Sequence, residues 1–244
     1  MLLEPAATTS RRLAIEKGIE LPAHEVHVWC VDLTVSSSQV RPLEELLSED
    51  ERLRAAQFRF PKHREGFVVR RGILRCILAG YLGSEAQSLH FCQGRQGKPA
   101  LARNREQIRF SLSHSHHIAV YAVARSREVG IDVERIDNSI RKDRIAEHFF
   151  SRTEESRLRT LPVEQQALVF FQLWTTKEAY LKAQGRGLDL SRNFEVPCFA
   201  TSGDTTSFAV DGAWTGRHFM PTDGYIAAVA AQGMDWQLKR MESL

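Results

Sequence analysis

Residues 129–134 read Val-Gly-Ile-Asp-Val-Glu, a short stretch in which apolar and acidic side chains alternate. Successive side chains of a β-strand point to opposite faces, so Asp132 and Glu134 lie on one face of the predicted strand and Ile131 and Val133 on the other. Two carboxylates on one face repel each other, and a hard divalent cation would compensate that repulsion. The motif therefore indicates either a metal site or an exposed strand edge with solvated acids.

The segments on either side of this strand predict further strands. Upstream, the run at residues 118–124 (IAVYAVA) has strand character, and the short turn at 125–128 predicts that it forms a hairpin with the acidic strand. Residues 25–33 alternate in the same way, and residues 225–230 form a second run of small apolar residues. The likeness between 118–124 and 225–232 hints at an internal duplication.

Helical periodicity marks two long segments, which together with the strands predict an α+β fold. Residues 65–82 carry apolar side chains at helical spacing and end at Gly83, and residues 164–183 end at the GRG of 185–187. Between them, Ser151 and Glu154 have the spacing of a capping box, in which each side chain satisfies a free amide at a helix start.

Three arginines lie on the polar face of the first long helix: Arg70, Arg71 and Arg75. A solvated helix face explains them, and contact of one or two with an anionic ligand is the alternative.

The bulk composition excludes several classes of protein. A net charge of +3, from 33 basic and 30 acidic residues, is too small to indicate nucleic acid binding, although a local basic patch could attract an acidic partner. The four cysteines are scattered, no secretory signal opens the sequence, and no apolar run is long enough to span a membrane. We expect a cytoplasmic protein without membrane or nucleic acid partners.

The second long helix carries Trp174, Glu178 and Lys182 on one stripe, at i, i+4 and i+8. An exposed Glu178–Lys182 ion pair would be worth only a few tenths of a kcal/mol, about 0.3–0.5. Trp174 on the same stripe indicates that the stripe is partly buried, so that both charged groups need partners.

A polar cluster precedes the run at 118–124. His114 stands among Ser111, Ser113 and Ser115, with Lys98 in a glycine-containing loop upstream. Zinc binding by His114 and a neighbouring histidine is disfavoured because no third ligand stands at a recognised spacing. Cation and hydroxyl donors fit a phosphate group better, and a surface loop explains Lys98 equally well.

Together these stretches resemble the signature of the 4′-phosphopantetheinyl transferases. The likeness covers about residues 60–190, and the chain length resembles the two-lobed, surfactin-synthetase-activating type. The matching stretches, in chain order, are GKP at 97–99, SLSHS at 111–115, VGIDVE at 129–134, FFSRTE at 149–154, WTTKEAYLK at 174–182 and GRGL at 185–188.

The resemblance implies two pseudo-symmetric α+β lobes of similar topology in a monomer, with the active site in the cleft between them. The expected domains are an irregular arm at 1–23, an N-terminal lobe at 24–124 and a C-terminal lobe at 125–244 that carries the metal site.

The resemblance also implies roles for individual residues. Asp132, Glu134 and Glu178 correspond to the acids that bind Mg²⁺, with Mn²⁺ as the alternative metal. The coenzyme A contacts correspond to Lys98, Pro99, Ser113, His114 and Lys182. Glu178, Lys182 and His114 are the expected catalytic groups, with Glu178 as the base.

The implied reaction is that of a holo-[acyl-carrier-protein] synthase: transfer of the 4′-phosphopantetheine moiety of coenzyme A to a serine of an apo carrier protein, releasing adenosine 3′,5′-bisphosphate. Acyl or peptidyl carriers of fatty acid, polyketide or nonribosomal peptide synthesis are the expected partners. A metal-dependent nuclease or phosphatase and a coenzyme A or carrier-binding module without catalysis are the alternatives.

Overall fold

The computed structural model describes residues 15–94, 97–137, 142–186, 194–196 and 205–241. These residues form two compact units. One unit combines the described residues up to Ile19 with Ser37–Leu89, and the other combines Glu20–Ser36 with the described residues from His90 onward. Most of the predicted arm at 1–23 lies outside the described residues, and the predicted lobe boundaries stay a prediction.

The smaller unit is helical: α1 (Ser37–Glu45), α2 (Glu49–Ala56), α3 (Pro61–Leu82) and the short η1 (Ala86–Ser88). The helix predicted at 65–82 is confirmed as α3 and begins four residues earlier, at Pro61, whose missing amide suits the first turn. It ends as predicted at Gly83, which adopts the left-handed conformation with φ of 59°.

A buried ion network joins α2 to α3. Arg75 is fully buried, and its Nε donates to Glu51 Oε2 at 2.6 Å while its Nη1 donates to the carbonyl oxygens of Ala86 and Leu89. Arg71 also pairs with Glu51. Arg75 is thus neither solvated nor open to a ligand, and both sequence-based interpretations are wrong for it.

Glu51→Gln should lower the free energy of unfolding by about 3–5 kcal/mol, because it leaves the charge of Arg75 buried without its carboxylate. The control is Glu45→Gln, which breaks an exposed i, i+4 pair with Arg41 and should change the free energy by less than about 0.5 kcal/mol. Denaturant titration followed by circular dichroism measures both. Equal, small losses would contradict the structural role of the network.

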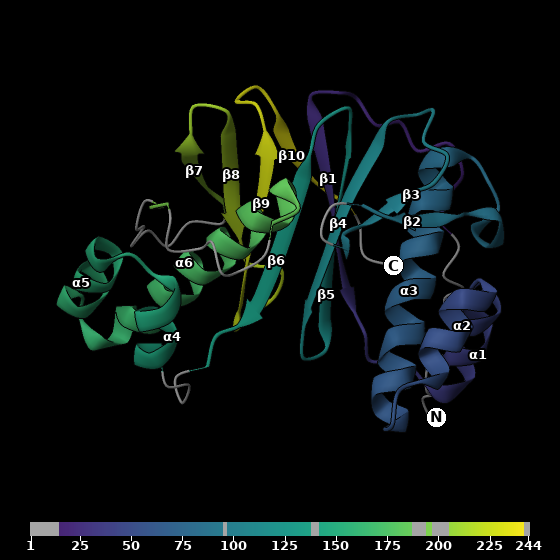
Figure 1. The fold of residues 1–244 in the computed structure, drawn as a ribbon, viewed down its shortest axis with the longest axis horizontal. Helices are drawn as coiled ribbons and strands as arrows, with labels where there is room; N and C mark the ends of the chain where they lie inside the picture. The colour runs from purple at the N-terminus through teal and green to yellow at the C-terminus, as the bar shows by residue number, and fades with distance from the viewer. Residues whose placement is uncertain (1–14, 95–96, 138–141, 187–193, 197–204, 242–244) are drawn as a thin grey trace, which may run out of the picture. The chain divides into compact units, whose positions relative to one another are not determined.

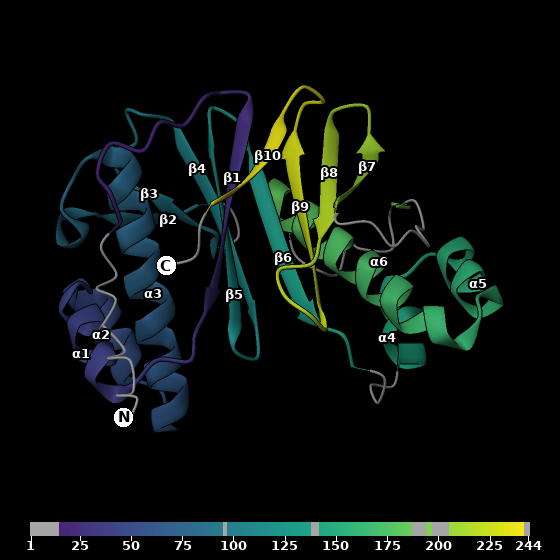
Figure 2. The same ribbon diagram turned by 180° about the vertical axis from the view of Figure 1, so that it is seen from behind.

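The larger unit contains two four-stranded sheets (Figures 1 and 2). The first has the order β10-β1-β5-β4 and the second β6-β9-β8-β7, and β2 and β3 form a separate two-stranded sheet. The strands, in chain order, are β1 (Glu25–Asp32), β2 (Phe91–Gln93), β3 (Pro99–Leu101), β4 (Ile108–Ser115), β5 (Ile118–Arg125), β6 (Val129–Arg135), β7 (Thr205–Asp211), β8 (Trp214–Phe219), β9 (Tyr225–Gln232) and β10 (Gln237–Met241).

The two runs of small residues occupy equivalent places. β5 lies between β1 and β4 in the first sheet, and β9 lies between β6 and β8 in the second. Two sheet-rich regions with helices confirm the predicted α+β class.

The predicted hairpin between β5 and β6 is wrong. β5 pairs antiparallel with β4 and β1, whereas β6 pairs antiparallel with β9. Residues 126–128 carry the chain from one sheet to the other, and the Arg127 side chain secures this crossing by donating to the carbonyl oxygens of Ala23 and Gln232. A short turn between two apolar runs therefore joins different sheets here.

One apolar core lies between the two sheets. Val28 of β1 and Val120 of β5 contribute to it from the first sheet, and Ile131, Val133 and Val229 contribute from the second. Since the odd-numbered residues of β6 face this core, its even-numbered residues face the other way, toward helix α6.

The described residues after β6 include the helices α4 (Lys142–Phe149), α5 (Arg152–Thr160) and α6 (Val163–Gln184). The predicted capping box is confirmed, because Ser151 Oγ accepts from the Glu154 amide and Glu154 Oε2 accepts from the Ser151 amide. The long helix predicted at 164–183 is confirmed as α6, which packs on β6 and β9 (Figure 1). No helix within the described ranges combines the length and apolarity needed to cross a membrane.

Candidate active site

The site begins with a close approach between β6 and α6. A Cβ atom placed on Gly130 would lie 2.0 Å from the carbonyl oxygen of Ala179 and 2.3 Å from the amide nitrogen of Ala183. Only glycine allows backbones to come this close. The turn of α6 that carries Glu178 and Lys182 is thereby held against the face of β6 that carries Asp132.

Gly130→Ala should lower the free energy of unfolding by about 3 kcal/mol, because the methyl group would push α6 away from β6. Gly212→Ala is the matched control: no atom lies within 4 Å of its added Cβ, and its effect should stay within about 0.5 kcal/mol. Urea titration of both variants measures the difference. A Gly130→Ala variant as stable as the control would show that α6 can move without cost.

Asp132 is the buried centre of the site. Its Oδ1 accepts hydrogen bonds from Lys182 Nζ at 2.6 Å and from Ser113 Oγ at 2.7 Å, while Lys182 Nζ also lies 3.1 Å from Ser113 Oγ. Only 3% of Asp132 is exposed, and its buried Oδ2 has no hydrogen-bond partner among the described residues. One oxygen of this carboxylate is thus bound, and the other remains available to a ligand.

Glu134 lies on the same face of β6, as its spacing predicts. Its Oε2 accepts from Ser115 Oγ at 2.8 Å, and the Trp174 side chain of α6 also hydrogen-bonds to it. Burial and the charge of Asp132 raise the pKa of Glu134, whereas the bonds from Ser115 and Trp174 oppose the rise. The sequence showed Trp174 only as a sign of burial and did not mark Ser115 as a partner of Glu134.

Glu178 completes the group of carboxylates. Burial is the main cause that raises its pKa to about 7, the charges of Asp132 and Glu134 add to the rise, and Lys182 opposes it. For Lys182, burial lowers the pKa, but Asp132 and Glu178 outweigh burial, so the pKa rises and the ammonium stays charged. The predicted Glu178–Lys182 stripe therefore belongs to a partly buried charge cluster.

The raised pKa of Glu178 makes stability depend on pH in metal-free buffer. The folded value of about 7 lies above the unfolded value of 4.5, so the folded protein retains a proton that the unfolded chain releases. Stability from this group is present below pH 4.5 and is lost as the pH rises through 7. Relative to wild type, Glu178→Gln should therefore gain up to about 3 kcal/mol between pH 5 and pH 8.

Chemical denaturation at several pH values measures this difference. Glu164→Gln, a change at an exposed position in the first turn of the same helix, provides the control and should give a flat difference. A flat profile for Glu178→Gln as well would contradict the charge cluster.

The predicted coenzyme A residues Lys98 and Pro99 line a cavity of about 270 Å³ together with Lys182. They also line a neighbouring cavity of about 610 Å³, which Glu128 and Arg109 border. Lys98 Nζ donates to the carbonyl oxygen of Val129 at 2.8 Å. Burial lowers its pKa, and the nearby carboxylate of Glu128 opposes that effect.

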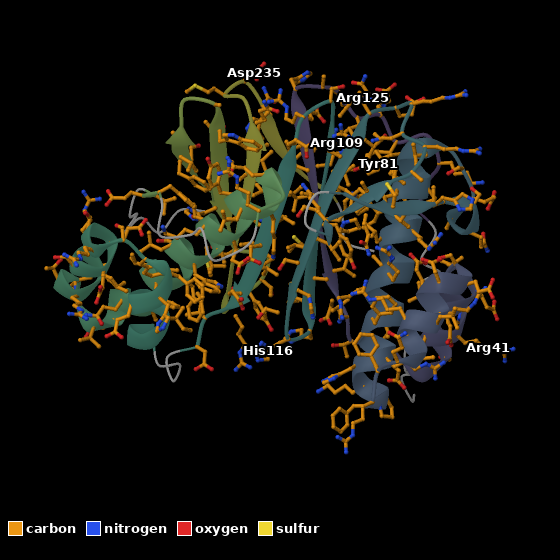
Figure 3. All side chains as sticks on the ribbon, viewed as in Figure 1. Arg41, Tyr81, Arg109, His116, Arg125 and Asp235 are labelled. Carbon is orange, nitrogen blue, oxygen red and sulfur yellow. The ribbon has the colours of Figure 1, made fainter. Side chains whose placement is uncertain are left out.

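The other two predicted contacts, Ser113 and His114, lie on β4. Figure 3 labels Arg109 near the start of this strand and His116 directly after its end. Ser113 points toward β6 and bonds to Asp132. His114 is the next residue, so its side chain leaves the opposite side of the strand, and it is exposed. The structure thus groups Ser113 with the carboxylates and does not group His114 with them. The GRGL stretch lies partly outside the described residues.

The donor set fits a divalent cation by its chemistry. Within the described ranges, no three His, Cys, Asp or Glu side chains are already arranged to hold a metal ion. However, burial and neighbouring carboxylates raise the pKa of Glu134 and of Glu178, and the buried Oδ2 of Asp132 has no partner in that part of the chain. Hard oxygen ligands with excess negative charge suit Mg²⁺ or Mn²⁺.

Comparisons with known proteins match both parts of the chain. Residues 128–230 match the 4′-phosphopantetheinyl transferase superfamily, and residues 34–126 match the family described as 4′-phosphopantetheinyl transferase, N-terminal. The chain is 40% identical over 224 residues to the 4′-phosphopantetheinyl transferase HetI of Nostoc sp. strain PCC 7120, which covers 91% of this chain and 94% of that protein. It is 33% identical over 150 residues to the 4′-phosphopantetheinyl transferase psf-1 of Bacillus pumilus, covering 62% of this chain and 63% of psf-1.

Proposed function

Because this chain belongs to the 4′-phosphopantetheinyl transferase superfamily, we propose that Asp132, Glu134, Glu178 and Lys182 form the site at which it transfers phosphopantetheine from coenzyme A to a carrier protein. The observation that supports this assignment is the cluster itself. Three carboxylates from β6 and α6 surround one ammonium beside a cavity.

Asp132, Glu134 and Glu178 would hold Mg²⁺ or Mn²⁺. The bound metal supplies Lewis acidity to the oxygens of the coenzyme A diphosphate. Asp132 offers its unpartnered Oδ2, while Ser113 and Lys182 hold Oδ1 in place. The carboxylate is thus oriented before any ligand arrives, which reduces the cost of ordering it.

In the proposed reaction the hydroxyl oxygen of a carrier serine bonds to the β-phosphorus of coenzyme A. The bond from that phosphorus to the bridging oxygen breaks, and adenosine 3′,5′-bisphosphate leaves with the electron pair. Glu178 accepts the serine proton, directly or through water. Lys182 stabilises the charge that develops on the phosphate oxygens.

Lys98 and Pro99 would contact coenzyme A where they line the cavity beside Lys182. Lys98 Nζ donates to the carbonyl oxygen of Val129, which fixes a positive charge beside the cavity. The contact of His114 with coenzyme A stays a prediction from the family resemblance, because its side chain leaves β4 on the side opposite Ser113. Ser113 would act mainly through its bond to Asp132.

The enzyme would be of the holo-[acyl-carrier-protein] synthase type and act as a cytoplasmic monomer on acyl or peptidyl carriers. Carrier proteins of this kind are generally acidic, and the net charge of +3 is compatible with all of them. A panel of apo carriers from fatty acid, polyketide and nonribosomal peptide synthesis would identify the partner.

The test is incubation of the protein with coenzyme A, Mg²⁺ and an apo carrier, followed by mass spectrometry of the carrier. A gain of one phosphopantetheine group supports transfer. Hydrolysis of coenzyme A without a carrier would favour a nuclease-like enzyme, and binding without either reaction would favour a binding module.

Asp132→Asn should lower the rate of transfer at least about 100-fold, because it removes a negative charge from the centre of the site at nearly constant size. Asp223→Asn, at an exposed turn, is the control and should keep the wild-type rate. Steady-state kinetics at limiting Mg²⁺ measure both variants. Wild-type kinetics for Asp132→Asn would remove Asp132 from the proposed site.

A further inference from the structure

A row of serine hydroxyls joins the two sheets at the site. Ser111 Oγ accepts from the amide of Ile131, and Ser115 Oγ accepts from the amide of Arg135, each at 3.2 Å. The two pairs follow the same order along both strands, so β4 and β6 lie parallel. In the described part of the chain no backbone ladder links them, and side chains bridge the strands instead.

Two further contacts distinguish Ser115 from Ser111: a short bond to Glu134, and a long contact of 3.4 Å with His116 Nδ1. A hydroxyl has one proton to donate and two lone pairs to accept with. Ser115 uses its proton for Glu134 Oε2 at 2.8 Å while a lone pair accepts from the Arg135 amide. The amide fixes the position of the hydroxyl, and the hydroxyl in turn fixes one oxygen of the carboxylate.

Glu134 is therefore held from two separate elements. Ser115 reaches it from β4 of the first sheet, and Trp174 reaches it from α6. A glutamate side chain has three rotatable bonds, and ordering it for a ligand costs conformational entropy. Because the Glu134 carboxylate is already bonded in the folded protein, much of its conformational entropy is lost on folding and not on ligand binding.

We propose that Ser115 is a positioning residue, which orients the Glu134 carboxylate for the metal and couples the first sheet to the site. The inference rests on the proposed function, since it takes Glu134 as a metal ligand. Ser115 does not touch the reacting atoms and acts through Glu134. Partners of this kind commonly change metal affinity 10- to 100-fold when removed.

The chain supplies its own control. Ser111→Ala removes a hydroxyl from the same face of the same strand and also leaves an amide of β6 without its acceptor. Ser115→Ala does the same and additionally releases Glu134. Both variants should lower the melting temperature to a similar extent, but only Ser115→Ala should weaken metal binding. Ser115→Thr keeps the hydroxyl and suits a strand, so it should restore the affinity.

Mn²⁺ titration of the free protein, followed by electron paramagnetic resonance of unbound Mn²⁺, measures this affinity without turnover. Coenzyme A is omitted because Ser111 lines the cavity beside Lys182. The dissociation constant should rise about 10-fold or more for Ser115→Ala and change less than about twofold for Ser111→Ala and Ser115→Thr.

Equal weakening in both alanine variants would overturn the proposal, because the hydroxyls would then only support the strands. Unchanged affinity in Ser115→Ala, or no recovery in Ser115→Thr, would also overturn it. If the wild-type protein bound no Mn²⁺, Glu134 would lose its assignment as a ligand and the proposal would fail with it. The carrier mass gain tests the transferase function separately, so the two failures can be told apart.

Discussion

The contact between Gly130 and helix α6 is the constraint on which the rest of the site depends. The backbones of β6 and α6 approach so closely that an added Cβ would meet the carbonyl oxygen of Ala179 at 2.0 Å. Glu178 lies one residue before Ala179, and Lys182 lies one turn later. A displaced helix would move both charged groups away from Asp132. Gly130 therefore determines where Glu178 and Lys182 lie relative to Asp132.

The charge balance of the carboxylate cluster explains why it suits a bound cation. In the described part of the chain, Asp132, Glu134 and Glu178 share one close ammonium, that of Lys182. Burial and the charge of Asp132 raise the pKa of Glu134 and Glu178, although Lys182 opposes the rise. A group of like charges in a partly buried site either takes up protons or binds a cation. Within the described residues, the buried Oδ2 of Asp132 has no hydrogen-bond partner, and a cation could bind there.

Two other buried cations in the described residues, Lys177 and Arg75, are each paired with a carboxylate and have a structural role. Lys177 bonds to Glu154 Oε2 at 3.0 Å and to the carbonyl oxygen of Phe194 at 2.7 Å, so its ammonium joins α6 to α5. Arg75 and Glu51 form the corresponding network in the helical unit. Lys177 and Lys182 belong to one motif on one helix, but their partners differ. Lys177 pairs with Glu154 and has a structural role, whereas Lys182 pairs with Asp132 in the candidate site.

The sequence by itself determined the features that depend on neighbours along the chain. The alternation at 129–134 predicted that Asp132 and Glu134 share a face, and helical spacing predicted the stripe of Trp174, Glu178 and Lys182. The end of α3 at Gly83 and the capping box before α5 were predictable for the same reason, since each depends on groups within four residues. The likeness of motifs indicated the family, which the comparisons confirm.

Only the tertiary structure decided which distant partner each group meets. The strands β5 and β6 look like a hairpin locally, but their ladders are completed by β1, β4 and β9. A helical projection places Arg75 on a solvated face. In the structure it is buried, because it bonds to Glu51, 24 positions away. The bond between Ser115 and Glu134 spans 19 positions and two sheets. Periodicity shows which face a side chain occupies, whereas the packing of remote elements determines what that face meets.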